Sequence, residues 1–367
     1  MTSEELKYKI ALTQIPFVGS VVAKYLVSYC GGVEAIFTEK KKNLLKIPAV
    51  GERIINSIVA FHEFERIEEE IEFIRKNNIE VLFYTDKAYP ARLSHCADAP
   101  VLIYKKGNAD LNQQKMLAIV GTRNATDYGK SICEKIVDEL SLLGVLIVSG
   151  LAYGIDITAH KAAVKNNLPT VGVVAHGLDR IYPSLHTSIA QKMISNGAII
   201  TEHISGVKPD RENFPMRNRI IAGMSDAVLV VEAARSGGAL ITADIANGYN
   251  RDVFAIPGRV NDPFSQGCND FIKANKAVLV EGAADIIYLL NWELEKKPKA
   301  PVQKQLFVNL SGEEKQLVDL LQDKGTMMID DICATCKLPV SKVSVTLLNL
   351  EFSGLVKSLP GKSYQLA

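Results

Sequence analysis

Short runs of apolar, often β-branched residues alternate with longer helical patterns between residues 79 and 290. Continuous apolar runs of this kind are typical of strands that helices cover on both faces of a sheet. Strand–helix–strand connections are right-handed and place successive strands in parallel. We therefore predict an α/β fold built on a parallel sheet. The clearest strands are expected at residues 116–120, 145–148, 170–174, 198–201, 227–231 and 252–256.

A repeated turn marks the first 65 or so residues. Segments 15–19 and 47–51 both read Ile-Pro-x-Val-Gly, and each precedes a helical pattern, at 20–29 and 52–64. A turn of this shape is typical of a helix-hairpin-helix, whose free N–H groups can hold a phosphate. Lysine and arginine are sparse in both turns, which favours a packing or interaction module over a DNA contact. We assign residues 1–65 to a helix-hairpin-helix or SAM-like helical domain.

The C-terminal part of the chain predicts a winged helix. A charged, proline-bearing stretch around residues 296–308 is expected to be a linker. Helical patterns follow at 312–323, 329–336 and 341–352, and two short strands flank Pro360-Gly361. Because Lys342 is the sole basic residue of the third helix, a protein contact is as well supported as a DNA contact. The expected domains are thus 1–65, 66–295 and 309–367.

Composition restricts the class of partner. The chain carries a net charge of +1, so a polyanion would have to be bound by a local patch. No apolar run reaches the ~18 residues that a membrane-spanning helix needs, and the N-terminus lacks an apolar signal core, so we expect a cytoplasmic protein. Six scattered cysteines are expected as reduced thiols. Cys333 and Cys336 lack the second pair of a zinc site, so we expect no metal.

Segments rich in small residues adjoin the ends of the predicted strands. They span residues 121–129, 149–156, 175–183, 214–225 and 236–238. We expect them to converge, because the carboxyl ends of parallel strands lie at one edge of a sheet. Arg217 and Arg219 stand near a helix start, where free N–H groups and planar guanidiniums both suit phosphate. Since residues i and i+2 of a helix point ~200° apart, one of the two arginines is expected to brace the fold or a dimer.

Other chemistries find less support in the sequence. The glycine pattern differs from the dinucleotide signature and has no acid placed for a ribose, so no bound cofactor is expected. No P-loop occurs either. His160 and His176 could touch a ligand but belong to no evident triad. Asp156 and Asp179 each follow a glycine turn, where we expect them to cap free N–H groups at a helix start.

Several motifs occur together in one order: Tyr-Pro-Ala-Arg-Leu at 89–93, Val-Gly-Thr-Arg at 120–123, Ser-Gly-Leu-Ala-Tyr-Gly-Ile-Asp at 149–156, and Phe-Ala-Ile-Pro-Gly at 254–258. Gly-Leu-Asp at 177–179, the arginine segment 214–225 and Ser-Gly-Gly at 236–238 lie between them. In this order the motifs resemble the DNA processing protein A (DprA/Smf) family of bacteria. The resemblance covers residues 89–290, and the front domain and tail match the family layout less specifically.

The resemblance implies an extended Rossmann-like domain that binds single-stranded DNA, protects it and helps to load the RecA recombinase during natural transformation. It also implies a homodimer formed through this domain and no catalytic turnover. Phe214 is the expected stacking platform for a base. The sequence departs from the family pattern at His176 and His186, which we leave out of the site. The positions expected to face DNA are Gly121, Arg123, Ser149, Gly150, Lys208, Arg211, Phe214, Arg217, Asn218, Arg219, Ser236, Gly237, Gly238 and Thr242.

Two further hypotheses concern the same domain. Glu232, the Ser-Gly-Gly turn and Thr242 look like the turn of Rossmann-like nucleotide hydrolases of the lysine-decarboxylase-like, cytokinin-activating type, although a proline and a third glycine are absent. Apolar residues 278–280 and 286–290 predict an edge strand and a final helix. An uncovered edge could form the two-fold dimer surface. Alternatively, the final helix packs back on its own sheet.

Overall fold

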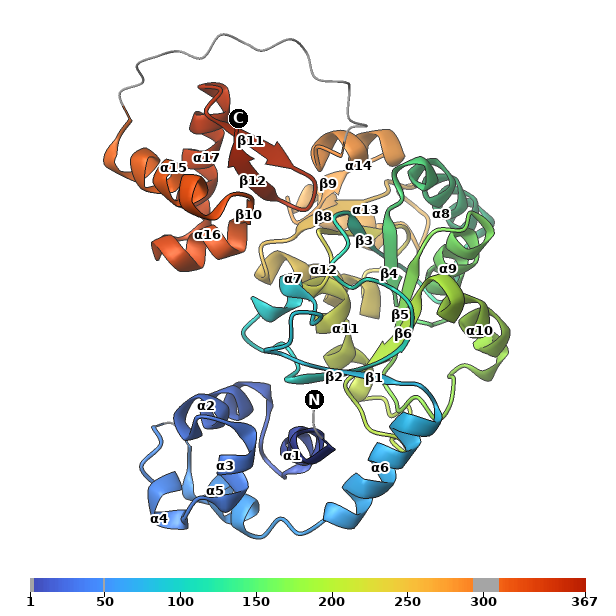
Figure 1. Cartoon of the computed structure of the whole chain (residues 1–367). Coiled ribbons are helices and arrows are strands. Elements are labelled where there is room, and N and C mark those ends of the chain that lie inside the picture. Colours follow the sequence, from blue (N-terminus) through green and yellow to red (C-terminus); the bar gives the residue numbers. More distant parts are fainter. Residues whose placement is uncertain (1–2, 49, 293–309) are drawn as a thin grey trace.

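The computed structural model describes residues 3–48, 50–292 and 310–367 of the chain. Three groups of elements follow one another: N-terminal helices, a large sheet with helices on both faces, and a C-terminal bundle with a small sheet (Figure 1). This arrangement confirms the predicted α/β fold with a helical front domain and a winged-helix tail. The linker expected at 296–308 lies outside the described residues.

A nine-stranded sheet forms the centre of the molecule, in the order β1-β2-β6-β5-β4-β3-β7-β8-β9 (Figure 1). Strands β3 to β9 pair in parallel, and β2 joins β6 antiparallel. The strands are β1 (Glu80–Phe83), β2 (Leu102–Gly107), β3 (Met116–Val120), β4 (Leu146–Ser149), β5 (Thr170–Val173), β6 (Ala198–Thr201), β7 (Ala227–Val230), β8 (Asp252–Ala255) and β9 (Val278–Leu279).

The six predicted strands are present, each within one residue of its expected bounds. Residues 278–279 form an edge strand, as predicted. Strands β1 and β2 are additional to the prediction. They pair antiparallel and are not separated by a long helix, so they lack the alternation that marks the parallel strands. The order β6-β5-β4-β3-β7-β8 is that of a Rossmann fold, and it reverses direction between β3 and β7.

Helices cover both faces of the sheet. On one face, α8 (Asp127–Leu140), α9 (Ile155–Lys165) and α14 (Ala283–Leu289) bury their apolar residues. On the other face lie α7 (Ala91–Ser94), α11 (Asn213–Gly223), α12 (Gly238–Gly248) and α13 (Gln266–Lys273). α10 (Thr187–Asn196) forms a smaller cluster with the ends of β5 and β6. Two layers of helix explain why the parallel strands are continuously apolar.

The N-terminal helices share their core with the edge of the sheet. They are α1 (Ser3–Gln14), α2 (Ser20–Cys30), α3 (Val33–Thr38), α4 (Lys41–Leu44), α5 (Glu52–Val59) and α6 (Phe64–Lys76). Their apolar residues form one cluster with Phe83, Leu102 and Tyr104 of β1 and β2. The boundary expected between residues 65 and 66 falls in α6, and the division into domains stays a prediction.

The single helix expected at residues 52–64 is wrong. α5 ends at Val59, and α6 begins at Phe64. The break lets Phe61 turn into the core, where its ring packs edge-on against Phe64 with centroids 5.5 Å apart. Both rings also pack against Phe37, so aromatic packing ends the helix here.

The C-terminal domain has the predicted helices α15 (Gly312–Lys324), α16 (Ile329–Cys336) and α17 (Val340–Phe352). A small sheet orders β10 (Met327–Met328), β12 (Ser363–Leu366) and β11 (Val356–Leu359), with β12 in the middle. Leu321, Ile332 and Leu347 are fully or almost fully buried in its core. At the start of α15, Ser311 and Glu314 form a capping box. The three helices and hairpin confirm the winged helix.

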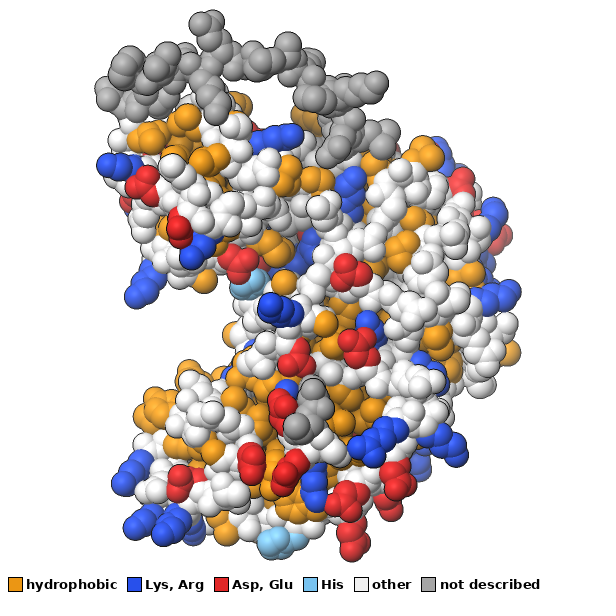
Figure 2. All heavy atoms as spheres, viewed as in Figure 1, with side chains coloured by type: hydrophobic (Ala, Val, Ile, Leu, Met, Phe, Trp, Pro, Cys, Tyr) orange, Lys and Arg blue, Asp and Glu red, His pale blue; other side chains and the backbone are white. Residues whose placement is uncertain are grey.

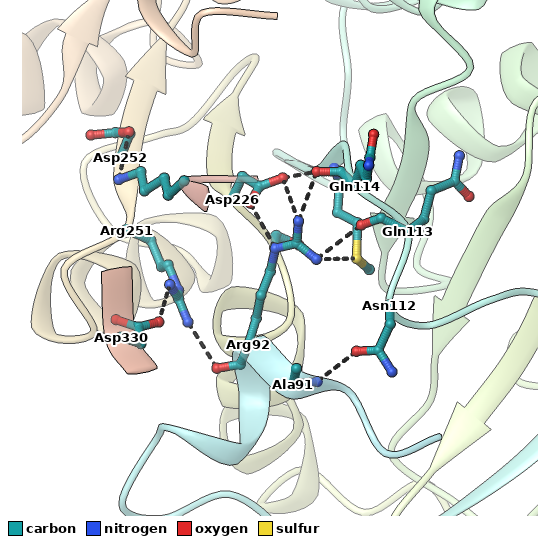
Figure 3. Close-up of polar contacts among 12 residues, drawn as sticks. Ala91, Arg92, Asn112, Gln113, Gln114, Asp226, Arg251, Asp252 and Asp330 are labelled. Carbon is teal, nitrogen blue, oxygen red and sulfur yellow. Dashed lines mark hydrogen bonds and ion pairs between the residues drawn. The ribbon is translucent and has the colours of Figure 1, made fainter. Parts of the chain in front are cut away.

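The winged helix contacts the amino end of β8, through Arg251 and Asp252, and Figure 3 shows the polar cluster formed there. Arg251, which is 6% exposed, donates from Nη1 to Asp330 at the start of α16, at 3.0 Å. Arg92 donates from Nε to Asp226 at 2.6 Å, and its remaining N–H groups reach the carbonyls of Gln113 and Gln114. These contacts tie the loop after β2, the start of β7 and the winged helix into one polar cluster.

The tip of the wing completes this contact. Gly361 lies so close to Arg92 and the Gln114 carbonyl that a β-carbon would stand 2.7 Å from each. Beside it, Lys362 pairs with Asp252 at 2.9 Å, and Asn291 donates to Ser358 at 2.6 Å. Figure 2 shows a recess on this face between the winged helix and the N-terminal helices. Across the described residues, no helix is both long and apolar enough to cross a membrane.

Candidate functional site

A hollow of about 770 Å³ lies where the strand order reverses. The carboxyl ends of β3 and β7 meet there, which is where doubly wound sheets bind ligands. Loops after β3, β4 and β7 supply its walls together with the start of α11. Among the expected site residues, those that line it are Gly121, Arg123, Arg211, Phe214, Arg217, Asn218, Ser236, Gly237, Gly238 and Thr242. The predicted convergence at one sheet edge is confirmed for these loops.

The lining favours an anion. Among the described residues, it holds three arginines, at positions 123, 211 and 217, and a single carboxylate, that of Asp156. Arg123 and Arg211 are exposed, whereas Arg217 is buried. Guanidiniums with free N–H groups bind phosphate through charge-assisted hydrogen bonds. The hollow is therefore a local cationic site in a chain of nearly zero net charge.

The first loop is held close to its neighbours. A β-carbon on Gly121 would lie 2.4 Å from Ile155 Cγ1, so only glycine fits. The backbone N–H of Thr122 donates to the carbonyl of Glu232 at 2.7 Å. Glu232 in turn accepts from the backbone N–H and hydroxyl of Thr126, at 2.9 and 2.5 Å. This network positions the loop so that Arg123 projects from its tip.

Arg123 lies beside an aromatic pair. Its guanidinium carbon is 5.5 Å from the ring centroid of Phe214, and the Phe214 ring lies 6.2 Å from that of Tyr182. These three residues also line a side pocket of about 60 Å³ adjoining the hollow. A flat ring placed here could stack on an aromatic face while a neighbouring phosphate meets the guanidinium. Phe214 thus lies where a stacking platform is expected.

Arg217 belongs to the floor of the hollow. Its Nη1 donates to the carbonyl of Val173, and its Nε donates to Asn218 Oδ1 at 3.2 Å. Burial lowers the pKa of Arg217 to about 10, although Asp156 opposes that shift. Burial also raises the pKa of Asp156, against the influence of Arg217. Each charge is therefore the main compensation for the other, because both side chains are buried.

Arg219 points elsewhere. It pairs with Glu202 at 2.5 Å, its side chain is 11% exposed, and it does not line the hollow. The separation of about 200° between residues i and i+2 of a helix accounts for this difference from Arg217. The expectation that the two arginines point in different directions is confirmed.

The Ser236-Gly237-Gly238 turn is exposed and open. A β-carbon on Gly237 or Gly238 would meet nothing within 4 Å, in contrast to Gly121. Folding therefore does not require these glycines for close packing. Asn218 donates to the Gly238 carbonyl at 3.3 Å, and the Thr242 hydroxyl donates to the same carbonyl at 3.1 Å. Because Gly237 and Gly238 have no side chains, a ligand has room to approach their backbone.

Three other expected positions lie outside the hollow. Ser149 is fully buried and donates to the Ile119 carbonyl at 2.5 Å. Gly150 lies beneath the floor, where a β-carbon would stand 2.3 Å from Asp156 and 2.8 Å from Arg217 Nη2. Lys208 is exposed on the segment before α11 but does not line the hollow. Ser149 and Gly150 thus shape the floor, and DNA contact by these three residues stays a prediction.

The capping role expected of two aspartates is wrong. Asp156 lies in the first turn of α9, but it accepts from the backbone N–H of Ala152 in the turn before the helix, at 3.4 Å, and lies beside Arg217. Asp179 accepts from the backbone N–H of Gly206 at 2.9 Å and from Arg180. It joins two loops rather than capping a helix. Each carboxyl also meets a group from a distant segment, Arg217 for Asp156 and Gly206 for Asp179, which local sequence does not reveal.

The histidines near the site are structural. His160 is fully buried between the Gly150 carbonyl and the Thr170 hydroxyl, and burial lowers its pKa to about 4. His176 lines the side pocket, where it contacts the Gly177 carbonyl through Nδ1 and accepts at Nε2 from the Tyr182 backbone N–H at 3.2 Å. Burial lowers its pKa too. His176 thereby holds the loop that carries Tyr182 toward Phe214.

His186 fixes the neighbouring loop. Its Nδ1 lies 2.8 Å from the Leu151 carbonyl, and its ring meets that of Tyr153 edge-on, with centroids 5.0 Å apart. Tyr153 and Tyr182 line the site but were absent from the expected set. Their signal is aromatic residues inside glycine-rich turns after strands. Within the described parts of the chain, no three or more His, Cys, Asp or Glu side chains gather where a metal could be held.

Comparison with known proteins accounts for the whole layout. The family model described as DNA recombination-mediator protein A matches residues 80–291, more than half of the chain. A DprA winged helix domain matches residues 297–362, and a helix-hairpin-helix motif matches residues 10–71. The chain belongs to the DNA recombination-mediator protein A family. Relatives of this chain carry the names DprA and Smf.

Relatives in this family are similar over most of their length. Protein Smf of Synechocystis is 33% identical over the full length of both chains. The solved structure of DprA from Streptococcus pneumoniae is 30% identical, with a TM-score of 0.67 over 78% of this chain and 98% of that one. DprA of Helicobacter pylori, solved for its single-stranded DNA binding mode, is 29% identical with a TM-score of 0.53 over 58% of this chain and 95% of that one.

Proposed function

We propose that this protein binds single-stranded DNA in the hollow between β3 and β7, protects it, and acts in DNA processing during natural transformation. One observation carries the proposal: Arg123 lies beside the Phe214–Tyr182 pair at the mouth of a cationic hollow. Single-strand sites combine cations that track phosphates with rings on which bases stack. The single-stranded DNA binding of the Helicobacter pylori relative supports the proposal.

The residues divide into those that would contact DNA and those that support the floor of the hollow. Arg123 and Arg211 are exposed and would meet phosphate directly, and Arg217 would supply charge from the floor. The open backbone at Ser236-Gly237-Gly238 would receive a phosphate or sugar without a clash. Phe214 and Tyr182 would receive a base. We place DNA contacts at these residues, and we assign Ser149 and Gly150 to support of the floor.

The proposal is tested by fluorescence anisotropy with labelled single- and double-stranded oligonucleotides at one salt concentration. Arg123→Ala should weaken single-strand binding by about 1.5–3 kcal/mol, the range for a hydrogen bond to a charged group. Arg75→Ala, at an exposed arginine on α6 remote from the hollow, is the matched control and should bind as the wild type does. Equal affinities for the Arg123→Ala variant and the wild type would remove this loop from the site.

The partners proposed for the DNA-bound protein are the RecA recombinase and a second copy of the chain. For the dimer, β9 is the edge strand, and Val278 and Leu279 are 50% and 45% exposed. On α14, Ile286 and Leu290 pack inward while Tyr288 is 78% exposed. One apolar edge of this kind can pair with its own copy about a two-fold axis. Light scattering of the wild type and Tyr288→Glu tests this surface, since a dimer should become a monomer.

We expect no catalytic turnover, and a cytoplasmic location suits a protein that acts on DNA. The nucleotide hydrolase alternative would need an acid facing the ligand. Glu232, which prompted that alternative, is 1% exposed and is held by Thr126 away from the hollow. Asp156 does line the hollow, but it is the counter-charge of Arg217. Release of free base from AMP or CMP would favour the hydrolase.

A further inference from the structure

A row of large apolar side chains runs along α2 and is exposed. Phe17, Val21, Tyr25 and Tyr29 are 57%, 45%, 47% and 56% exposed. Residues 21, 25 and 29 are four apart, so they lie on one side of the helix, and Phe17 precedes it in the hairpin turn. A helix normally turns such a stripe toward the core. Here the core face of α2 is formed by other residues, Ala23 and Leu26. Hydrophobic side chains are visible over the place of α2 in Figure 2.

Val21 of this row lines a second hollow, of about 560 Å³, between α2 and the α11–α12 pair. Gly19, Ser20, Val21 and Val22 form one wall. The opposite wall comes from the sheet domain and includes Met216, which is 54% exposed. Pro215 and Ile241 line this second hollow and also the first one. The two hollows therefore adjoin, and a chain leaving the first across Pro215 and Ile241 enters the second.

The side chains along this path include several cations, which suit the phosphates of a nucleic acid. The guanidinium of Arg53 stacks on the Phe17 ring at 3.7 Å from its centroid. Arg219 lines the second hollow. The acid in its wall is Asp98, which accepts a hydrogen bond from the Tyr249 hydroxyl. Lys24 also lies on α2, where its Nζ reaches the carbonyls of Cys96 and Ala97 at 3.4 and 3.3 Å.

We propose that the N-terminal domain extends the single-stranded DNA site. A strand held in the first hollow continues over Pro215 and Ile241, passes Val21, and stacks its next bases on Tyr25 and Tyr29. The proposal rests on the proposed binding of single-stranded DNA in the first hollow. Rings spaced along a path beside cations are the means by which proteins hold single strands without reading their sequence. From Val21 to Tyr29 the helix rises about 12 Å, enough to serve more than one base.

The same face could in principle receive a protein, but its position favours DNA. The row opens from the wall of a hollow that adjoins the phosphate-binding loops, and Phe17 carries an arginine on its ring. Single-strand sites combine aromatic rings for stacking with arginines that add cation–π contacts. The shared wall makes the row a continuation of one surface rather than a separate patch.

The test compares two lengths of oligothymidine by fluorescence anisotropy. About six nucleotides should occupy the first hollow alone, and about twenty should also reach α2. In the full-length protein, the double variant Tyr25→Ala/Tyr29→Ala should lose about tenfold or more in affinity for the long oligonucleotide, because one stacked base is worth roughly a factor of 5 to 150. Its affinity for the short oligonucleotide should be that of the wild type.

Two controls separate stacking from structure. Tyr25→Phe/Tyr29→Phe keeps the rings and should restore the long-oligonucleotide affinity. Phe352→Ala removes a ring that is 82% exposed on the winged helix and should leave both affinities unchanged. A 2-aminopurine near the distal end of the long oligonucleotide should be quenched by the wild type and less by the double variant.

The outcomes are distinct. If the wild type binds neither length, the proposed function itself fails, and this extension fails with it. If the wild type binds both lengths but the double alanine variant loses nothing on the long one, the extension is overturned while the proposed function stands; a face used only for protein docking gives this result. An equal loss on both lengths also overturns it, since the rings would then act on the first hollow or on the fold.

Discussion

Asp330 of the winged helix lies 3.0 Å from Nη1 of Arg251, a guanidinium that is 6% exposed and belongs to the sheet domain. The other terminal nitrogen of Arg251 donates to the Arg92 carbonyl at 2.8 Å. This contact lies at the amino ends of β3, β7 and β8, whereas the hollow lies at their carboxyl ends. The winged helix is therefore fastened to the side of the sheet that faces away from the proposed DNA site.

Asp330→Ala should lower the free energy of unfolding by about 3 kcal/mol, because it leaves Arg251 buried without a carboxylate. The same variant should make the contact surfaces of the sheet domain and the winged helix more susceptible to limited proteolysis. Urea unfolding of the full chain measures the first effect. Asp319→Ala, at an exposed position on α15, is the matched control and should change the stability by less than about 0.5 kcal/mol. Identical transitions for both variants would contradict the role of the Arg251–Asp330 pair.

A second docking contact depends on pH. His95 Nε2 lies 3.2 Å from Asp331, and the hydrogen bond to that carboxylate raises the pKa of His95. Since the folded pKa lies above the unfolded value of about 6.5, the stabilisation is complete below that value and is lost as the pH rises through the folded pKa. The melting temperature of the wild type should therefore exceed that of His95→Gln at pH 5.5 and approach it at pH 8.5. An equal difference at both pH values would contradict this coupling.

Arg217 and Arg219 should give opposite results in binding. Arg219→Ala removes the pair with Glu202 and should lower the melting temperature, while the salt dependence of binding to a strand of about six nucleotides held in the first hollow alone stays unchanged. Arg211→Ala and Arg217→Ala should each flatten the slope of log K against log salt, by up to roughly 0.7, the value for one phosphate neutralised on a single strand. Titrations at several salt concentrations measure the slopes. A flattened slope for this short strand in Arg219→Ala would place this arginine in the first hollow.

The buried position of Arg217 adds a stability effect. Arg217→Ala leaves Asp156 without its compensating charge and should destabilise the protein by about 3–5 kcal/mol. Adding Asp156→Asn should recover part of that loss, because no buried carboxylate then remains. Urea unfolding of both single variants and the double variant completes the cycle. Strictly additive effects would show that the two side chains do not depend on each other.

The glycines of the two main loops should separate folding from binding. Gly237→Ala meets open space and should leave the stability within about 1 kcal/mol of the wild type, while its methyl group hinders the approach of DNA. Gly121→Ala would place a β-carbon 2.4 Å from Ile155 and should destabilise the fold by about 1–3 kcal/mol. Thermal melts and anisotropy on both variants measure the two effects. A folding defect in Gly237→Ala would show that the turn is needed for packing.

Sequence periodicity predicted the parallel strands well, because strands covered on both faces must be apolar throughout. It also predicted that the loops around Gly121, Arg123 and Gly238 meet, since the carboxyl ends of parallel strands share an edge. It could not show that Ser149 lies buried beneath these loops, because a serine after a strand can point either way. The angle between i and i+2 predicted that Arg217 and Arg219 diverge, but not which of them turns inward.

Contacts between distant segments were beyond the reach of sequence patterns. No local pattern links Arg92 to Asp226 or Arg251 to Asp330, and only the folded chain brings these side chains together. Asp156 and Arg217 also come from distant segments. The sequence around Asp156 therefore predicted only a capping role for this carboxylate. Strands β1 and β2 were missed because the layer that covers them comes from the N-terminal helices rather than from the connections within the sheet.

The core that the N-terminal helices share with β1 and β2 bears on how the chain can be divided. Phe83, Leu102 and Tyr104 are each at most 2% exposed and lie in that shared cluster. A shortened chain that starts at Glu80, where the match to the family model begins, would bring these side chains into contact with water. Newly wetted apolar surface of this kind promotes self-association. The isolated sheet domain would therefore tend to self-associate. The role of the N-terminal helices is better tested by point substitution than by deletion.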